Sequence, residues 1–340
     1  MRDLVVAGGG PIGLVTSLYA ARAGLDVVVR EPRQGVIDKA CGEGLMPAAV
    51  AGLLDLGVTL DGHPIEGIRY VDPGHDVEAR FRHGPGRGVR RTTLHAALLE
   101  AVAAAGVTVE HRAVEQVEDR GSHVLVDGQP ARHLVAADGL HSPLRRLLGL
   151  DAPVAVARRF GLRCHVDVVP WTSFVEVHWS PHGEAYVTPV GDARVGVAVL
   201  TSRRGGFEDL LEDFPTLAPR LRGLVRTKVR GAGPLRQRAT ARVRGRCLLV
   251  GDAAGYVDAL TGEGIAVGVA QARAAVAAVL ADDPAGYERR WRRVTWRHDL
   301  LTHGLLTATR HRSLRTRIVP AASALPRVFE LAVNQLARPA

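Results

Sequence analysis

The chain opens with two short hydrophobic runs on either side of an apolar segment of helical length. Residues 4–7 (LVVA) and 27–29 (VVV) are continuous apolar runs, which is typical of buried strands. The turn before the helix reads Gly8-Gly9-Gly10-Pro11-Ile12-Gly13. The pattern therefore predicts a strand, a glycine turn, a helix and a second strand that ends on Glu31.

Strands and helices continue to alternate along the chain. Short apolar runs predict strands at 107–109, 124–126, 135–137 and 246–250. Four further strands, separated by Pro, Gly and Asp, predict an antiparallel sheet at 160–168, 174–179, 185–190 and 195–200. Helical spacing marks 92–105, 265–280 and the chain from 285 onward, with breaks near Pro320 and Pro326.

With 340 residues, the chain is longer than one simple core usually holds, so two packed lobes are expected. A discontinuous nucleotide-binding domain is predicted from residues 1–60, 90–155 and 245–284. The substrate-binding β-sheet lid is predicted from residues 61–89 and 156–244, and the C-terminal helices from residues 285–340.

The composition is that of an ordinary globular protein, with 46% hydrophobic and 23% charged residues. No apolar run reaches the roughly 18 residues that span a bilayer, and no signal-peptide pattern precedes the first strand. Cys41, Cys164 and Cys247 lack metal-ligand spacing and do not suggest a disulfide framework. We therefore expect a cytoplasmic protein without a metal site.

The net charge of +9 comes almost entirely from arginine, because Lys39 and Lys228 are the two lysines among 44 basic residues. No nucleic-acid-binding motif accompanies this charge, so no nucleic-acid partner is expected. Residues 285–317 contain nine arginines against Glu288 and Asp299, a net charge of +7. This stretch is either solvated surface or a contact with a membrane surface or an acidic carrier.

The glycine turn has the chemistry of a dinucleotide site. Gly8 permits a tight turn, Gly10 lets the backbone approach a pyrophosphate, and Gly13 lets the helix lie close to the sheet. Glu31, at the end of the second strand, suits the ribose hydroxyls of FAD or NAD and repels a 2′-phosphate. The remaining candidate contacts in this region are Pro11, Ile12 and Arg33.

Two later segments each end a hydrophobic strand on a small-residue turn with one aspartate: 134–139 (LVAADG) and 247–252 (CLLVGD). Each acid, Asp138 and Asp252, either binds a cofactor at the carboxyl edge of the sheet or caps the helix that follows. A third segment, 260–265 (LTGEGI), opens the long helix. Its glycines would let backbone N–H groups approach a reduced flavin, which makes Gly262, Gly264 and Ile265 candidate contacts.

In the order and spacing of these three motifs, the chain resembles the FAD-dependent monooxygenases of the aromatic-hydroxylase type and the geranylgeranyl reductases. The resemblance implies an α/β fold: a Rossmann-like FAD-binding domain, an inserted mainly antiparallel β-sheet substrate domain and a C-terminal helical segment. It also implies that Gly251 and Asp252 contact the ribityl chain and pyrophosphate. Arg91 matches a family arginine that touches the cofactor, with Arg90 as a competitor.

Other residues bear on the branch of the superfamily. Residues 41–45 (CGEGL) resemble the reductases, and Gly255 and Ala259 stand where many hydroxylases have histidine and proline. A single glycine fingerprint implies that NAD(P)H visits transiently or that a separate partner reduces the flavin. The catalytic residue stays unknown, with Cys41 (a redox thiol or a packed small residue) and His178 as candidates.

Apolar and aromatic residues concentrated in the predicted lid favour a hydrophobic small-molecule substrate. We expect first an NAD(P)H-dependent monooxygenase that hydroxylates or epoxidises an aromatic, polyketide or isoprenoid molecule in bacterial natural-product biosynthesis. The alternative is an FAD-dependent reductase of isoprenoid double bonds. A third interpretation is an FAD-binding redox sensor or assembly partner.

Overall fold

The computed structural model describes residues 1–154 and 158–338 of the chain. Its main sheet contains five parallel strands in the order β20-β11-β1-β2-β8. These strands are Cys247–Leu249, Gln129–Ala136, Arg2–Ala7, Val27–Arg30 and Thr108–Glu110. Their apolar runs are buried between packed layers, as parallel strands require.

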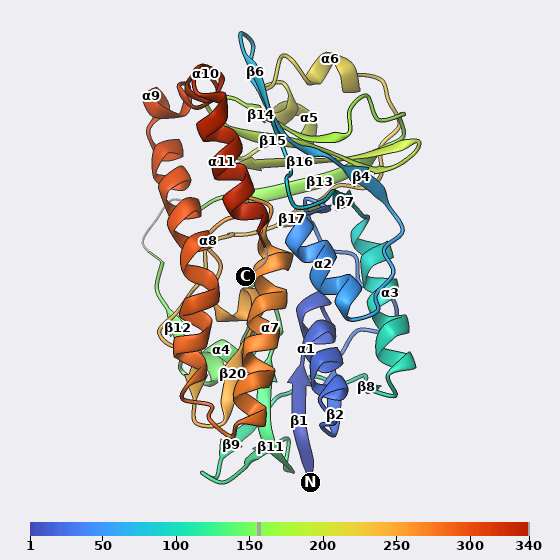
Figure 1. Ribbon diagram of the computed structural model, residues 1–340, viewed down its shortest axis with the longest axis vertical. Coiled ribbons are helices and arrows are strands. Elements are labelled where there is room, and N and C mark those ends of the chain that lie inside the picture. Colours follow the sequence, from blue (N-terminus) through green and yellow to red (C-terminus); the bar gives the residue numbers. More distant parts are fainter. Residues whose placement is uncertain (155–157, 339–340) are drawn as a thin grey trace.

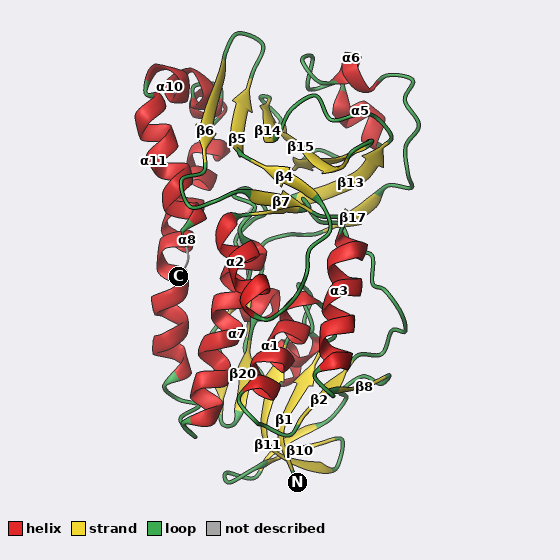
Figure 2. Cartoon of the chain, turned by 45° about the vertical axis from the view of Figure 1, so that its right-hand side comes forward, coloured by secondary structure: helices red, strands yellow, loops and turns green. Residues whose placement is uncertain are grey.

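Three helices cover this sheet, as Figure 2 shows. They are α1 (Pro11–Arg22), α3 (Arg91–Ala104) and α7 (Gly264–Leu280). At one edge β19 (Val243–Arg244) pairs antiparallel with β20, although the sequence boundary assigned it to the lid. β10 (Val124–Val126) pairs antiparallel with the first residues of β11, and β9 (Val117–Asp119) pairs antiparallel with β10. The parallel order makes β1, β2, β11 and β20 end at one common edge.

A second sheet lies across that edge, at the top of Figure 1. Its order is β17-β13-β16-β15-β14-β5-β6, and every pair is antiparallel except β14 with β5. The strands are Arg230–Ala232, Phe160–Val166, Arg194–Thr201, Gly183–Gly191, Phe174–Trp179, Gly67–Val71 and Asp76–Arg80. Two short helices, α5 (Phe207–Leu211) and α6 (Ala218–Leu221), complete a second core on its outer face.

Smaller elements join the two sheets. A three-stranded sheet consists of β3 (Gly44–Leu45), β7 (Gly86–Gly88) and β4 (His63–Ile65), and α2 (Pro47–Asp55) packs against α7. A short strand pair joins β12 (Asp151–Ala152) to β18 (Arg238–Ala239), and α4 spans Pro143–Leu147. The domain boundary placed between residues 155 and 156 lies outside the described residues.

The C-terminal segment consists of α8 (Tyr287–Arg310), α9 (Arg312–Arg315), α10 (Ile318–Ala324) and α11 (Pro326–Ala337). α8 packs on α7, whereas α10 and α11 pack on β6 of the upper sheet. The break predicted near Pro320 lies at residues 316–317, between α9 and α10, because Pro320 stands in the first turn of α10, where proline is tolerated. None of the helices described is long and apolar enough to cross a membrane.

The observed architecture confirms the predicted α/β fold with its inserted, mainly antiparallel sheet and C-terminal helices. Some elements differ from the prediction. The expected strand at 135–137 is the end of the longer β11, and α2 and the β5–β6 hairpin were not predicted. The β5 and β6 runs are only partly buried, so their apolar pattern is weak.

Arg30, the last residue of β2, fastens this strand to its neighbours. Its side chain is almost fully buried, and its guanidinium donates hydrogen bonds to Glu110 at 3.0 Å, Asp127 at 3.0 Å and Gln129 at 2.6 Å. Glu110 ends β8, Asp127 lies in the turn after β10, and Gln129 begins β11. The cation therefore joins β2 to β8 and to the β10–β11 hairpin.

We predict that Arg30→Met lowers the free energy of unfolding by about 2–3 kcal/mol, because it leaves Asp127 without its cation and Glu110 with Arg112 alone. The control is Arg22→Met, which breaks an exposed ion pair with Asp55 and should cost at most about 1 kcal/mol. Urea unfolding followed by circular dichroism measures both. Equal losses in the two variants would contradict a structural role for Arg30.

Candidate functional site

A cavity of about 810 Å³ lies between the common edge of the parallel strands and the upper sheet. Segments far apart in the chain line it, and they include all the motifs that the sequence singled out. The lining comprises parts of residues 7–12, 30–33, 38–46, 137–144, 250–252 and 256–265, together with Arg91 and the inner face of the upper sheet.

The glycine turn is fixed by close backbone contacts. Gly8 has a φ of +110°, and a Cβ on it would lie 2.4 Å from the carbonyl oxygen of Ala137. A Cβ on Gly13 would lie 1.8 Å from the carbonyl oxygen of Gly8. Gly10 differs, because the nearest atom to its Cβ position is Arg91 Nη2 at 4.0 Å. Gly8 and Gly13 are therefore needed for packing, whereas Gly10 leaves room beside the backbone.

The start of α1 is suited to an anion. Its N-cap residue is Gly10, and within the described chain no side chain caps it. First-turn N–H groups without an intrahelical partner, together with the helix dipole, favour negative charge at this point. Pro11 occupies the first helical position, where the missing N–H costs nothing.

Glu31 and His95 hold the turn from two sides. Glu31 Oε2 accepts the N–H of Gly9 at 2.8 Å, and Arg33 Nε donates to Glu31 Oε1 at 2.7 Å. Burial would raise the pKa of Glu31, but the hydrogen bonds from Arg33 and Gly9 lower it below its usual value. His95 Nδ1 accepts the N–H of Ile37, so His95 Nε2 donates to the Gly9 carbonyl at 2.7 Å.

Of the two neighbouring arginines, Arg91 lines the cavity and Arg90 is the N-cap residue of α3. Arg91 is 8% exposed, and its buried Nε has no hydrogen-bond partner among the described residues. Burial lowers its pKa below the usual value. A buried guanidinium aimed at the space over Gly10 fits a ligand with negative charge.

The two strand-end aspartates have different surroundings. Asp138 accepts hydrogen bonds from Ser142 Oγ and from the N–H of Leu144 at 2.9 Å, so its carboxylate caps α4. Asp252 has no side-chain hydrogen bond within the part of the chain that the structure describes. Burial raises the pKa of Asp252, and Lys39 and Arg91 oppose this rise. Asp252 is thus available to a ligand, whereas Asp138, which also lines the cavity, is occupied.

Residues 259–264 form a loop that ends at the start of α7, and we call it the 259–264 loop. Gly262 has a φ of +69°, and no atom of the described residues lies within 4 Å of its Cβ position. Glu263 binds His298 Nδ1 of α8 at 2.7 Å, and Thr261 bonds Thr302 of the same helix. The carbonyl of Leu260 accepts the Tyr186 hydroxyl at 2.9 Å. The loop is therefore held between α8 and the upper sheet.

The segment with Cys41 rests on a buried charge cluster. Glu43 has a φ of +60°, a conformation that is strained for a non-glycine residue. Its carboxylate accepts the N–H of Arg91 at 2.8 Å and binds His165 Nε2 at 2.7 Å, with Arg163 Nη2 at 3.7 Å. Cys41 Sγ in turn accepts the N–H of Glu43. Glu43 therefore positions both Cys41 and Arg91 at the cavity wall.

The two catalytic candidates are separated by the structure. Cys41 lines the cavity, and burial raises the pKa of its thiol, which favours the neutral form over a reactive thiolate. His178 lies on the outer face of β14, where it bonds Thr216 at 2.9 Å and Glu176 at 3.1 Å. His178 is therefore no longer a catalytic candidate, because Val175 and Val177, and not His178, face the cavity from this strand.

One end of the cavity, which we call the apolar arm, is walled by residues of β4, β5, β14 and α11. The lining residues from these elements are Ile65, Ile68, Tyr70, Val175, Val177, Val333 and Leu336. None of them carries a charge, and Phe81 beside β6 adds to the same wall. The charged lining residues lie toward the glycine turn and the β13–β17 side.

Sequence reasoning missed several residues at this site. His95 lies in the predicted helix at 92–105 and Lys39 precedes the CGEGL segment, but neither was named as a site residue. Lys39 Nζ lies 3.3 Å from the Cβ position of Gly139. The contributions of Val333 and Leu336 arise from the packing of a C-terminal helix on β6, which no local pattern reveals. Glu43 could have been found, because it stands in the conspicuous CGEGL segment.

Comparison with known proteins identifies the family. Residues 1–287 match the family described as FAD binding domain. Menaquinone reductase of Mycolicibacterium smegmatis is 32% identical to this chain, and the alignment covers 85% of this chain and 79% of the relative. Digeranylgeranylglycerophospholipid reductase of Methanosarcina acetivorans is 28% identical, and the alignment covers 88% of this chain and 82% of the relative.

Among solved structures, a flavoprotein/dehydrogenase from Cytophaga hutchinsonii has a TM-score of 0.85. It is 18% identical and covers 98% of this chain and 92% of that one, a likeness of fold. These matches confirm the resemblance drawn from the three motifs. The chain belongs to the FAD binding domain family and is an FAD-dependent oxidoreductase.

Proposed function

We propose that this flavoprotein reduces a carbon–carbon double bond in the polyprenyl chain of a lipid. The observation that carries the proposal is the apolar arm, whose uncharged wall suits a chain without hydrogen-bonding groups. The two relatives are named for menaquinone and digeranylgeranylglycerophospholipid, which are both lipids with polyprenyl chains. Because both are also named reductases, we place reduction ahead of the monooxygenation expected from the sequence.

The residues around the glycine turn fit FAD. We propose that the start of α1 (Gly10, Pro11, Ile12) and Arg91 hold the pyrophosphate, and that Glu31 and Arg33 face the ribose. Asp252 would accept hydrogen bonds from the ribityl chain. The 259–264 loop and the start of α7 would place the N–H groups at Gly262, Gly264 and Ile265 beside the ring. Arg33 must release Glu31 for this, and its side chain is about half exposed.

Bound FAD supplies two reducing equivalents, which come in turn from NAD(P)H or from a separate electron donor. Saturating a double bond also requires a proton on one of its carbons. Cys41 holds such a proton on Sγ at the cavity wall, since burial keeps the thiol neutral. Arg91, whose charge favours the thiolate, would stabilise the sulfur after the proton leaves.

The decisive experiment mixes the FAD-loaded, dithionite-reduced protein anaerobically with a menaquinone or a geranylgeranyl lipid, and then exposes the products to air before mass spectrometry. A stable gain of two hydrogens supports chain reduction, whereas quinone-ring reduction reverses in air. Oxygen insertion with NAD(P)H in air would favour the monooxygenase instead. A product unchanged under both regimes would overturn both enzymatic proposals and favour the redox sensor.

We predict that Asp252→Ala weakens FAD binding roughly ten- to hundredfold, because a hydrogen bond to a charged group contributes about 1.5–3 kcal/mol. The matched control is Asp138→Ala, which should lower the unfolding midpoint through loss of the α4 cap and affect FAD less. Flavin absorbance per protein and urea unfolding measure the two effects. Unchanged flavin occupancy in Asp252→Ala would contradict the assignment.

For Cys41→Ala we expect kcat for lipid reduction to fall about a hundredfold, as for loss of a general acid, while FAD occupancy and KM stay near the wild-type values. Cys41→Ser should recover part of the rate, because a hydroxyl still holds a proton. Stopped-flow reoxidation of the reduced protein by the lipid gives these constants. A normal kcat in the alanine variant would show that Cys41 is a packing residue.

A further inference from the structure

The two sides of α8 have different tasks. On its inner side, His298 and Thr302 bind the 259–264 loop through Glu263 and Thr261. On its outer side, Trp296 and Leu300 are 54% and 64% exposed. Their spacing of four residues places them on one stripe of the helix. A large aromatic residue and a leucine thus face solvent directly behind the loop that we assign to the flavin.

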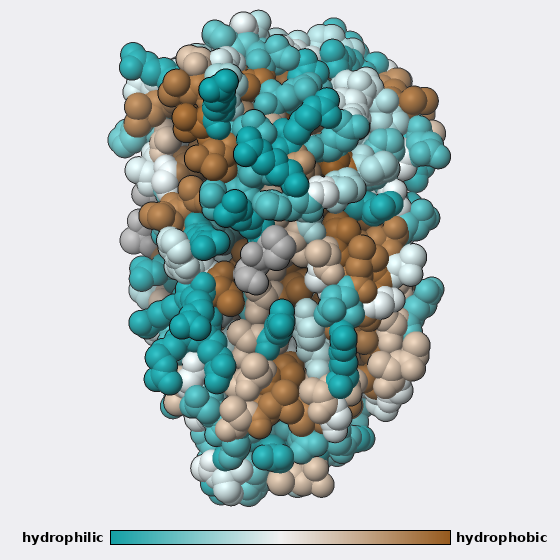
Figure 3. Space-filling model, in the orientation of Figure 1, coloured by the Kyte–Doolittle hydropathy of each residue, from teal (hydrophilic) through white to brown (hydrophobic). Residues whose placement is uncertain are grey.

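α11 shows the same division between an inner and an outer side. Val333 and Leu336 line the apolar arm of the cavity. Leu325, which precedes the helix, and Val328 and Leu331 within it recur every three residues and are 53–59% exposed. In Figure 3 hydrophobic residues gather over α10 and α11. α11 therefore separates the apolar arm from an apolar outer surface.

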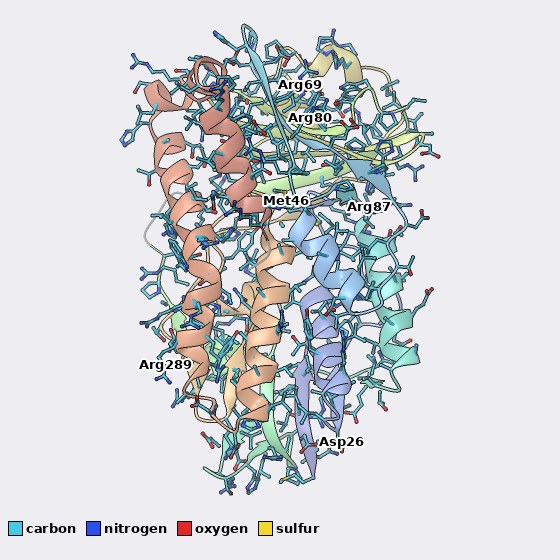
Figure 4. The ribbon with its side chains drawn as sticks, in the orientation of Figure 1. Asp26, Met46, Arg69, Arg80, Arg87 and Arg289 are labelled. Atoms are coloured by element: carbon cyan, nitrogen blue, oxygen red, sulfur yellow. The ribbon has the colours of Figure 1, made fainter. Side chains whose placement is uncertain are left out.

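Unpaired cations accompany these exposed apolar residues. Arg289, Arg290 and Arg293 on α8 and Arg317 and Arg327 farther along are exposed, and no acidic partner binds them among the described residues. Arg297 stacks on the ring of Trp296 at 5.3 Å. Figure 4 shows Arg289 at the outer edge of α8. We call the exposed apolar residues and arginines of α8–α11 the docking face.

We propose that the docking face rests on an anionic lipid bilayer and that lipid substrate enters the apolar arm beside α11. The proposal relies on the proposed function for the lipid nature of the substrate. Tryptophan and leucine flanked by arginine are the residues that bind the headgroup boundary, because the apolar parts insert while the cations meet lipid phosphates. Because the unpaired arginines make the docking face positively charged, we propose that the bilayer it binds carries anionic lipids.

Other occupants would need other features. A second copy of this chain would bring the same unpaired arginines against each other, which like-charge repulsion opposes. An acidic carrier protein would satisfy the cations, but it would leave the apolar surface of α11 unexplained unless it also carried an apolar patch. The bilayer satisfies both the cations and the apolar side chains, and it holds the substrate.

The test is co-sedimentation of the FAD-loaded full chain with sucrose-loaded vesicles of phosphatidylcholine alone or with phosphatidylglycerol added. We expect binding that requires phosphatidylglycerol and weakens with salt. Arg289→Glu/Arg293→Glu should weaken it at least about tenfold, since each basic residue near the surface contributes about fivefold. Trp296→Ser/Leu300→Ser should also weaken it. The charge-matched control, Arg204→Glu/Lys228→Glu, lies on exposed loops of the upper lobe and should bind normally.

Three outcomes would overturn the docking proposal: no vesicle binding, equal binding to neutral vesicles, or equal losses in the control variant. A wild-type dimer that Trp296→Ser/Leu300→Ser dissociates, seen by analytical ultracentrifugation, would make the face a protein interface. An activity assay with the lipid dispersed in detergent tests the proposed reaction separately from membrane binding. The docking variants should keep wild-type activity in this assay. If the wild-type protein binds vesicles but is inactive in detergent, the proposed reductase activity is wrong and the docking proposal stands.

Discussion

The close backbone contact between the glycine turn and the end of β11 is the constraint on which the rest of the site depends. Gly8 lies against Ala137 and Gly13 against Gly8 so closely that a methyl group fits at neither position. This contact places the start of α1 directly on the edge where the parallel strands end. Because β2, β11 and β20 end at the same edge, the parallel strand order alone brings Glu31, Asp138 and Asp252 together there.

Convergence alone does not determine which of these acids can meet a ligand; their hydrogen bonds do. Asp138 caps α4, and Glu31 binds Gly9 and Arg33, so Arg33 must release Glu31 before it can bind a ligand. The turn after Asp252 is instead supported by Arg145, which donates to the carbonyls of Asp252 and Ala253. Arg145 binds only the backbone carbonyls of this turn. The side-chain carboxylate of Asp252 therefore stays unpaired at the cavity.

Features that depend on neighbouring residues could be predicted from the sequence, and features that depend on long-range contacts could not. The glycine fingerprint, the strand ends and the long helix depend on neighbours in the chain, so their patterns could be recognised. The orientation of His178 could not, because β14 is buried on both faces and alternation does not say which face is inward. The pairing of Glu43 with His165 and the arrival of α11 at the cavity depend on contacts across more than a hundred residues, for which the sequence has no local signal.

α8 connects the parts that these long-range contacts create. Glu263 is buried, and burial raises its pKa above the usual value although the bond to His298 opposes this rise. The bond to α8 therefore offsets part of the cost of burying this carboxylate. In the upper sheet, the Tyr186 hydroxyl donates to the carbonyl of Leu260 in the same loop, so the position of the loop depends on both lobes. A lipid chain that entered beside α11 would reach this loop along the apolar arm and would not cross the charged end of the cavity. The charged end of the cavity is thus built by the glycine turn, the strand ends and the β13–β17 side, whereas the apolar end is completed only when α11, near the end of the chain, packs on β6.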